Sequence, residues 1–327
     1  MDAAIIGSGK WGLNHVKTMY NILEKYYKNN YSLTVCDVND QNEKTVKTIS
    51  QKIIFTTDLN TILENNKINI AIVSTPAETH YAVTKTLLES GKNVLTEKPL
   101  TFISKETEDL IQIAEERNLK LMTGHVLLFH PAVKKMKELI DINVLGKIHY
   151  IYSNRLNLGT VRKQENILYS FAPHDVSIIQ FLLGTYPVHI SASGGSYLQK
   201  GIEDTTITIL KYPDNIHCHI FVSWLHPFKE QRFVVVGDQG MLVFEDSAKT
   251  EKLKYYSKGF NVIDGELEKF DSSYEVVEFE NSPALENEQL HFIDAVLNNK
   301  IPLADGHHAL EVLRILESAQ EYLKNIY

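Results

Sequence analysis

The sequence predicts an α/β protein in which a doubly wound parallel sheet of the Rossmann type precedes an α+β domain with a large open antiparallel sheet. The chain has 327 residues, which exceeds the size of a typical single core and favours two domains. Strand and helix patterns alternate over the first third, whereas strand patterns separated by turn residues follow one another later. We therefore expect a first domain over residues 1–123 and a second over residues 124–327.

The first domain is predicted from short apolar runs separated by amphipathic segments. Its expected strands are residues 3–6, 31–36, 68–73, 94–95 and 119–122, and its expected helices cover 13–26, a segment from about 41, 80–90 and 104–118. Because strand and helix alternate, the strands are expected to be parallel and joined by helical crossovers.

The second domain is predicted to combine four helices with a series of antiparallel strands. The expected helices are residues 132–145, 173–183, 283–297 and 307–326, and the expected strands are 147–153, 205–212, 217–224, 231–236 and 241–245. Turn sequences at residues 213–215 and 237–240 separate successive strands. Pro173 is suited to the start of a helix, and Asp175 would then lie at its N-terminus, where the helix dipole favours a carboxylate.

Composition excludes some classes of partner. Acidic residues outnumber basic ones by 41 to 33, which argues against nucleic acid or a membrane surface as the general partner. No apolar run has the length of a membrane span, and no secretion signal is evident. Cys36 and Cys218 make no disulfide framework, so we expect a cytoplasmic protein. His217 and His219 share a strand face without an evident third ligand, and we expect no metal.

A glycine-rich turn, Gly7, Gly9 and Gly12, lies between the first strand and the first helix. Such glycines allow backbone N–H groups to approach a pyrophosphate at a helix N-terminus. Asp37 ends the next strand, where a carboxylate binds ribose hydroxyls and repels a 2′-phosphate, which favours NAD over NADP. A purely structural glycine loop is the alternative. The expected cofactor-binding residues are Gly7, Ser8, Gly9, Lys10, Trp11, Gly12, Asp37, Ser74, Thr75, Pro76, His80 and Glu97.

Two further segments, residues 73–80 and 96–99, follow predicted strands. Ligands of an open α/β sheet bind outside the carboxyl ends of its strands. Lys98 is thereby expected in the same crevice as the glycine turn, with Pro99 fixing the backbone beyond it. An ordinary surface lysine is the alternative.

These motifs together resemble the family of glucose–fructose oxidoreductase, inositol dehydrogenase and MocA. The motifs are GxGxxGxxH ending at His15, TPxxxH from Thr75 to His80, and EKP from Glu97 to Pro99. The resemblance covers the whole chain. It implies a dinucleotide-binding domain, a C-terminal domain with an open antiparallel sheet, and a homodimer or homotetramer formed through that sheet.

The resemblance also suggests a second catalytic group. The segment Ser170-Phe-Ala-Pro-His174 matches a family motif in which an aspartate precedes the histidine by four residues, and Ser170 takes the place of that aspartate. Oxidation of a hydroxyl requires a base and a cation that stabilises the developing alkoxide. We expect His174 as the acid/base and Lys98 as the electrostatic partner, and the reverse assignment stays open. A histidine that only caps a helix is the alternative.

The substrate is expected to be a sugar or nucleotide sugar. Residues 154–170 hold two of the five arginines in the chain, and a guanidinium suits a diphosphate or carboxylate. The segment resembles the branch of the family that acts on nucleotide sugars in surface-glycan and lipid A synthesis, including the 3-dehydrogenases of UDP-N-acetylglucosamine and of its uronic acid. The expected substrate-binding residues are His130, Arg155, Asn157, Arg162, Asn166 and Tyr169.

Several functions remain compatible with these observations. A dehydrogenase of a free sugar or inositol uses the same groups. A non-catalytic regulator would keep the fold and bind NAD(P), although the presence of Lys98 and His174 argues against it. A glycosidase that oxidises its substrate transiently with bound NAD is the third possibility.

Overall fold

The computed structural model describes residues 1–28, 30–163 and 165–324. The chain forms two compact units, which are residues 1–129 with 282–313, and residues 130–281 with 314–327. The first boundary falls close to residue 124. Residues 282–313 were expected in the second domain but group with the first unit, because the helix that follows residue 283 packs against the helix that follows the glycine turn.

The first unit contains a six-stranded parallel sheet. Its elements are β1 (Asp2–Ile6), α1 (Gly12–Tyr27), β2 (Ser32–Cys36), α2 (Asn42–Ile49), β3 (Ile54–Thr56), α3 (Asn60–Leu63), β4 (Ile68–Val73), η1 (Ala77–Thr79), α4 (His80–Glu89), β5 (Asn93–Glu97), α5 (Ser104–Glu116), β6 (Leu121–Gly124), η2 (Val126–Phe129), α8 (Ala284–Leu297) and the first part of α9 (Gly306–Lys324). The strand order is β3-β2-β1-β4-β5-β6, with all neighbours parallel. The order reverses between β1 and β4, and ligands bind at such a switch point.

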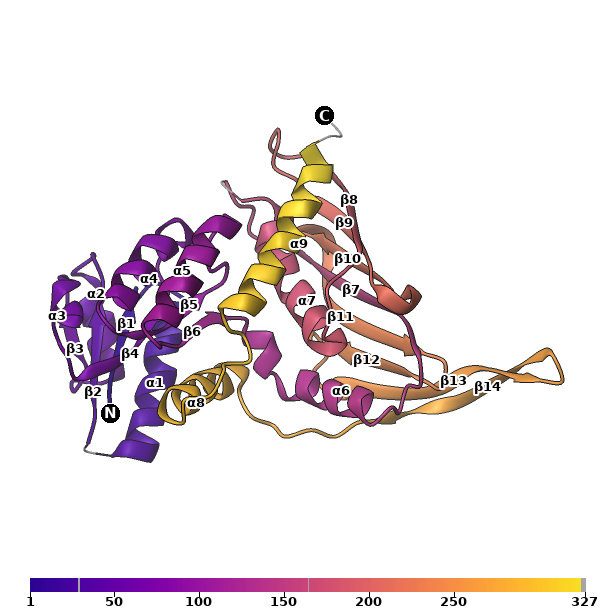
Figure 1. The fold of residues 1–327 in the computed structure, drawn as a ribbon, viewed down its shortest axis with the longest axis horizontal. Helices are drawn as coiled ribbons and strands as arrows, with labels where there is room; N and C mark the ends of the chain where they lie inside the picture. The colour runs from indigo at the N-terminus through magenta and orange to yellow at the C-terminus, as the bar shows by residue number, and fades with distance from the viewer. Residues whose placement is uncertain (29, 164, 325–327) are drawn as a thin grey trace. The chain divides into compact units, whose positions relative to one another are not determined.

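The core of this unit lies between the sheet and its helices. Strand β4 alternates little and is almost wholly buried, which is the pattern of a parallel strand covered on both faces. Helix α8 lies beside α1 although more than 250 residues separate them in the sequence (Figure 1). The Rossmann sheet predicted from the sequence is therefore confirmed, with β3 and α3 as additional short elements.

The second unit contains an eight-stranded sheet. Its elements are α6 (Pro131–Asp141), β7 (Ile148–Leu158), α7 (Ile167–Leu183), β8 (His189–Gly195), β9 (Thr205–Lys211), η3 (Pro213–Asn215), β10 (His217–Ser223), β11 (Leu225–Gly237), β12 (Met241–Glu245), β13 (Leu253–Ile263), β14 (Glu266–Val276) and the rest of α9. The strand order is β14-β13-β12-β11-β7-β10-β9-β8. Helices α6 and α7 lie against one face of the sheet (Figure 1), and β9 alternates between buried and exposed residues. Within the residues described, no helix combines the length and apolarity that crossing a bilayer requires.

Two expectations for this unit need correction. The sheet is antiparallel except for one parallel pair, β7 and β10, because β7 is inserted between strands that are close in sequence. Helix α7 begins at Ile167 rather than at Pro173, because the Asn166 side chain caps it by accepting a hydrogen bond from the Tyr169 N–H at 3.2 Å. Pro173 therefore lies inside the helix, and Asp175 is not at its N-terminus.

Strands β13 and β14, neither of which was predicted, form a long hairpin that projects beyond the sheet (Figure 1). Ile263 pairs with Glu266, so Asp264 and Gly265 form a two-residue turn. Both have positive φ values, 53° and 86°, as a type I′ turn requires. The Asp-Gly pair was a usable hairpin signal.

Candidate functional site

The glycine turn between β1 and α1 has no room for side chains at two of its positions. A Cβ atom on Gly7 would lie 2.5 Å from the Ser74 carbonyl oxygen, and the φ of Gly7 is +92°. A Cβ on Gly12 would lie 2.2 Å from the Gly7 carbonyl oxygen. Glycine is therefore required at both, because the turn packs directly against the end of β4.

The third glycine has a different environment. A Cβ on Gly9 would meet nothing within 4 Å, and Gly9, Lys10 and Trp11 are exposed. Among the described residues, no side chain caps the start of α1, and its first turn contains no acidic residue. The open backbone beside Gly9 and the uncapped helix N-terminus are suited to a pyrophosphate, so these residues fit a dinucleotide.

Asp37 follows β2 and holds the glycine turn in place. Its Oδ2 accepts hydrogen bonds from the Ser8 N–H at 2.6 Å and the Ser8 hydroxyl at 2.7 Å, and its Oδ1 accepts one from the Asn39 N–H at 2.9 Å. Burial opposes ionisation, but these hydrogen bonds outweigh it and hold the pKa of Asp37 below its usual value. An ionised carboxylate here repels a phosphate on the adenosine ribose, which favours NAD.

The segment after β4 is tied to the segment after β5. The Ser74 N–H donates to the Ile6 carbonyl at 2.8 Å, which places Ser74 beside the glycine turn. The ring of His80 is buried between two carbonyl oxygens, with Nδ1 2.7 Å from Pro99 O and Nε2 3.0 Å from Thr75 O. His80 therefore joins the Thr75-Pro76 turn to the turn that contains Lys98.

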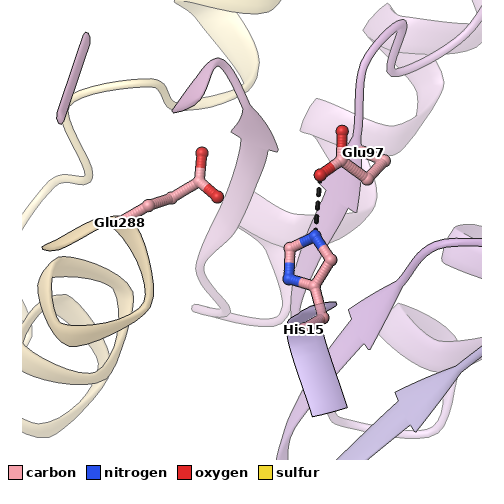
Figure 2. Close-up of side chains that lie close together, drawn as sticks. All are labelled: His15, Glu97 and Glu288. Carbon is pink, nitrogen blue, oxygen red and sulfur yellow. Dashed lines mark hydrogen bonds and ion pairs between the residues drawn. The ribbon is translucent and has the colours of Figure 1, made fainter. Parts of the chain in front are cut away.

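Lys98 directly follows β5 and is half-buried. Strands β1, β4 and β5 are adjacent and parallel, so the glycine turn, residues 74–76 and Lys98 lie at one edge of the sheet. Glu97 accepts hydrogen bonds from the side chains of Trp11 and His15 (Figure 2). Every residue predicted for the cofactor thus lies at this edge or in direct contact with a residue there.

The site expected in the second unit is organised differently. His174 lies within α7 and is half-buried. Its neighbour Asp175 is buried and accepts bonds from Arg155 Nε at 2.8 Å, Arg155 Nη2 at 3.0 Å and the Ser153 hydroxyl at 2.6 Å. The guanidinium of Arg155 is thereby engaged in a two-contact ion pair between β7 and α7.

Other residues predicted for substrate also contact partners within this unit. Asn166 caps α7, and its amide donates to Glu203 at 2.5 Å and Gln320 at 2.7 Å. His130 caps α6, because its Nδ1 accepts from the Ala132 N–H at 3.1 Å. Burial lowers the pKa of His130, and Lys252 lowers it further against the opposing charge of Asp246.

The remaining predicted residues are less constrained. The Arg162 side chain is 57% exposed, and its Nε lies 3.5 Å from Glu165. Asn157 and Tyr169 are half-buried, and burial, with the charge of Glu317, raises the pKa of Tyr169 to about 12. Among the arginines of residues 154–170, Arg162 is the one whose guanidinium is largely open to solvent.

Three buried residues near Glu97 were not predicted for the site: His15, Glu288 and Gln289. The spacing of His15 after the glycines was a usable signal, since it is the last position of the GxGxxGxxH motif. Glu288 and Gln289 lie on α8, more than 270 positions after His15. In the sequence, their one signal was that two polar residues stand where the helical period of α8 predicts buried apolar ones.

The fold and this edge of the sheet define a class: an NAD-binding oxidoreductase with a Rossmann fold. Residues 1–125 match a family model described as "Oxidoreductase family, NAD-binding Rossmann fold", and residues 133–243 match the "GFO/IDH/MocA C-terminal domain". The two models belong to one family and together match well over half of the chain. The chain belongs to the Gfo/Idh/MocA oxidoreductase family.

Three relatives illustrate the similarity. The UDP-N-acetylglucosamine 3-dehydrogenase of Acidithiobacillus ferrooxidans is 30% identical over 129 residues, which are 39% of this chain and 40% of that protein. A solved structure of the UDP-N-acetylglucosamine 3-dehydrogenase GnnA from the same organism superposes with a TM-score of 0.84 over 99% of this chain and 98% of its own, at 21% identity. The scyllo-inositol 2-dehydrogenase (NAD(+)) of Bacillus subtilis is 22% identical over 98% of this chain and 94% of its own. GenD2 from gentamicin A biosynthesis, solved in complex with NAD, has a TM-score of 0.81 at 21% identity, over 100% of this chain and 95% of its own.

Proposed function

We propose that this oxidoreductase oxidises a secondary hydroxyl of a sugar to a ketone, with a nucleotide sugar such as UDP-N-acetylglucosamine oxidised at C3 in surface-glycan or lipid A synthesis. The observation that carries the proposal is the position of Lys98. It is a half-buried cation at the carboxyl end of β5, two strands away from the glycine turn that follows β1. A cation at that edge lies outside the carboxyl ends of the strands, where such folds bind a dinucleotide.

Bound NAD supplies the hydride acceptor. In our proposal the Lys98 ammonium stabilises the negative charge that develops on the substrate oxygen. His174 takes the hydroxyl proton, because an imidazole near neutral pKa is an effective general base. The opposite assignment, with Lys98 accepting the proton, uses the same two side chains.

The nucleotide-sugar substrate is supported by the relative with 30% identity, although that match covers only 40% of the relative. Within residues 154–170, Arg162 is our candidate for the diphosphate, because Arg155 is paired with buried Asp175. Asn157 and Tyr169 are the other candidates for sugar contacts. The inositol dehydrogenase relative supports a free polyol as the alternative substrate. The uronic acid of UDP-N-acetylglucosamine, a regulatory role and an NAD-dependent glycosidase are further alternatives.

The test is a screen of free sugars, inositols and UDP-sugars with NAD, read as absorbance at 340 nm and by mass spectrometry for the loss of two hydrogens. We expect turnover of a UDP-sugar that is lost in Lys98→Met. Equal efficiency with the free sugar would refute the nucleotide-sugar proposal. Release of an aglycone without net NADH would indicate a glycosidase.

We also propose a homodimer or homotetramer formed through the open sheet of the second unit. Tyr150, Ile207 and Ile209 are exposed on β7 and β9, and these apolar side chains could pack against a second copy of the chain. Light scattering at micromolar concentration tests this, and a strict monomer would refute it.

Cys36 and Cys218 are buried free thiols, in keeping with the cytoplasmic location that we propose.

A further inference from the structure

The carboxylate of Glu97 accepts three hydrogen bonds at the end of β5. Its Oε1 accepts from the indole N–H of Trp11 at 2.5 Å and from Nε2 of His15 at 2.7 Å (Figure 2). Its Oε2 accepts from the backbone N–H of Lys98 at 3.2 Å. Glu97 is 8% exposed, so these contacts are shielded from solvent and remain strong.

The first two donors come from the start of α1. Trp11 is the residue before the first turn of this helix, and its side chain is part of the exposed surface beside Gly9. His15 is fully buried one turn later. Glu97 therefore connects the glycine turn, which follows β1, with the lysine turn, which follows β5.

Gln289 determines which nitrogen of His15 carries the proton. Its amide nitrogen lies 3.0 Å from His15 Nδ1 and 3.3 Å from the His15 carbonyl oxygen, and an amide NH₂ group only donates. Nδ1 is therefore the acceptor, and Nε2 carries the hydrogen that is donated to Glu97. The contact is a directed hydrogen bond whose orientation is set by α8.

The two carboxyl groups near His15, those of Glu97 and Glu288, differ in their state of ionisation. Burial raises the pKa of Glu97, but the hydrogen bonds from His15 and Trp11 and the charge of Lys98 outweigh it, so that Glu97 is ionised. Burial, together with the charge of Glu97, raises the pKa of Glu288 well above its usual value. Neither oxygen of Glu288 has a hydrogen-bond partner among the described residues, although its carboxyl group points toward the pair (Figure 2). Glu97 is thus the anionic member and Glu288 the neutral one.

The same three side chains have the chemistry of metal ligands, since their ligand atoms lie within 4.8 Å of one another. A tetrahedral ion with bonds of about 2.1 Å holds its ligand atoms about 3.4 Å apart. His15 Nε2 and Glu97 Oε1 are only 2.7 Å apart, and Nε2 carries a hydrogen. The pair is accordingly a hydrogen bond, and we assign no metal to it.

We propose that Glu97 is a positioning residue that couples the dinucleotide-binding turn to Lys98, through Trp11 and His15 on one side and the Lys98 backbone on the other. This inference rests on the proposed function, because it assumes that Lys98, the residue that Glu97 positions, acts in catalysis. His80 anchors the other side of the lysine turn through Pro99. Dinucleotide binding beside Trp11 then reorganises the same carboxylate that holds Lys98.

A spectroscopic experiment tests the coupling without turnover. The chain contains two tryptophans, Trp11 and Trp224, so protein labelled with ¹⁵N in the indole ring gives two indole N–H signals. Trp11→Phe assigns them. We expect Glu97→Gln to move the Trp11 signal upfield and NAD to shift it in the wild type. The Trp224 signal, whose N–H donates to Asp204, should stay in place. An unchanged Trp11 signal in Glu97→Gln would overturn the proposal.

A kinetic experiment tests the effect on Lys98. We expect Glu97→Gln to lower kcat by about 10- to 100-fold, because small displacements of a catalytic group have effects of this size. The substrate KM should change much less. The alkaline side of the pH profile should move to lower pH, because the Lys98 ammonium loses the attraction of the Glu97 charge. Unchanged kcat and pH profile would contradict the proposal.

Glu288→Gln is the matched control, because it replaces a neutral acid by a neutral amide of the same shape in the same cluster. We expect kcat within about twofold of the wild type at neutral pH. A loss equal to that of Glu97→Gln would assign the effect to the cluster as a whole and overturn a specific role of Glu97. If Glu97→Gln does not fold, Trp11→Phe removes one of the three hydrogen bonds to Glu97 from the donor side. Its readout is then kinetic, and an unchanged kcat in that variant would contradict the proposal. If the wild type oxidises no sugar, the proposed function fails, whereas the indole spectrum still decides the coupling.

Discussion

The sheet edge of the first unit and residues 154–170 of the second unit differ in which groups they leave open: backbone beside Gly9 in the first, and the Arg162 side chain in the second. In the first unit, Asp37, His80 and Glu97 bind neighbouring turns and leave the backbone beside Gly9 open. In the second unit, Arg155 and Asn166 are bound to partners from other elements of the same unit. The comparison teaches that most polar residues of each region hold its own structure, and that few side chains remain open to solvent. Four predictions test that comparison.

The largest expected effect is in the second unit, at His174. His174→Ala should lower kcat by about 10²- to 10⁴-fold through the loss of a general base. NAD affinity, measured by calorimetry, should stay the same, because we expect the glycine turn and Asp37 to hold the nucleotide. A variant with near-normal turnover would show that His174 is a structural residue of α7.

The next effect is in the first unit, at Lys98. Lys98→Met keeps the apolar stem and removes the cation, so kcat should fall by about 10²- to 10³-fold. Steady-state kinetics with NAD and the substrate from the screen provide the measurement. Near-normal turnover would refute the proposed mechanism, while weakened NAD binding would indicate a cofactor contact instead.

The two arginines of residues 154–170 differ in burial, and we expect Arg155 to stabilise the fold and Arg162 to bind substrate. Arg155→Ala leaves the buried Asp175 carboxylate without its cationic partner and should reduce the free energy of unfolding by about 3 to 5 kcal/mol, measured by chemical denaturation. Arg162→Ala should leave stability unchanged, because the side chain is exposed, and should raise KM for a UDP-sugar by about tenfold. The reverse pattern would contradict this assignment.

The smallest effect on activity is expected at Glu288, where the change appears in stability. When folding raises the pKa of a carboxyl group, its contribution to the free energy of unfolding is fully present below the unfolded-state pKa. That contribution is lost as the pH rises through the folded-state pKa. For Glu288 the loss begins near pH 4.5 and continues upward at about 1.4 kcal/mol per pH unit until the folded-state pKa is reached. Glu288→Gln should therefore exceed the wild type in Tm by a margin that grows as the pH rises above 4.5, until the folded-state pKa of Glu288 is reached. A constant difference in Tm would show that Glu288 is ionised in the folded protein.

Features determined by neighbours in sequence could be predicted. The glycine turn, Asp37 after β2 and Lys98 after β5 follow from short spacings and from the rule that parallel strands share a carboxyl edge. Likewise, the apolar periods predicted most helices to within a few residues. The parallel pairing of β7 with β10 could not be derived, because register between distant strands depends on the whole sheet.

The residues that were misjudged depend on distant partners. Pro173 was expected to start α7 because proline suits that position, whereas the capping Asn166 decides the start and the helix continues through the proline. Arg155 on β7 pairs with Asp175 on α7. His15 on α1 contacts Glu97 on β5 and Gln289 on α8. The sequence does not show which of these elements are adjacent. Geometry within each unit was needed to separate these structural contacts from ligand-binding groups.

The projecting hairpin also bears on how the eight-stranded sheet avoids aggregation. Strand β14 ends the sheet, so one of its sides has no neighbouring strand among the described residues. An unpaired strand edge is a template on which other chains can add. Glu266, Glu268, Lys269 and Asp271 are exposed along β14, and their charges make such addition unfavourable. Replacing them by neutral β-formers would convert this arm into a nucleus for intermolecular strand pairing while leaving both units otherwise intact.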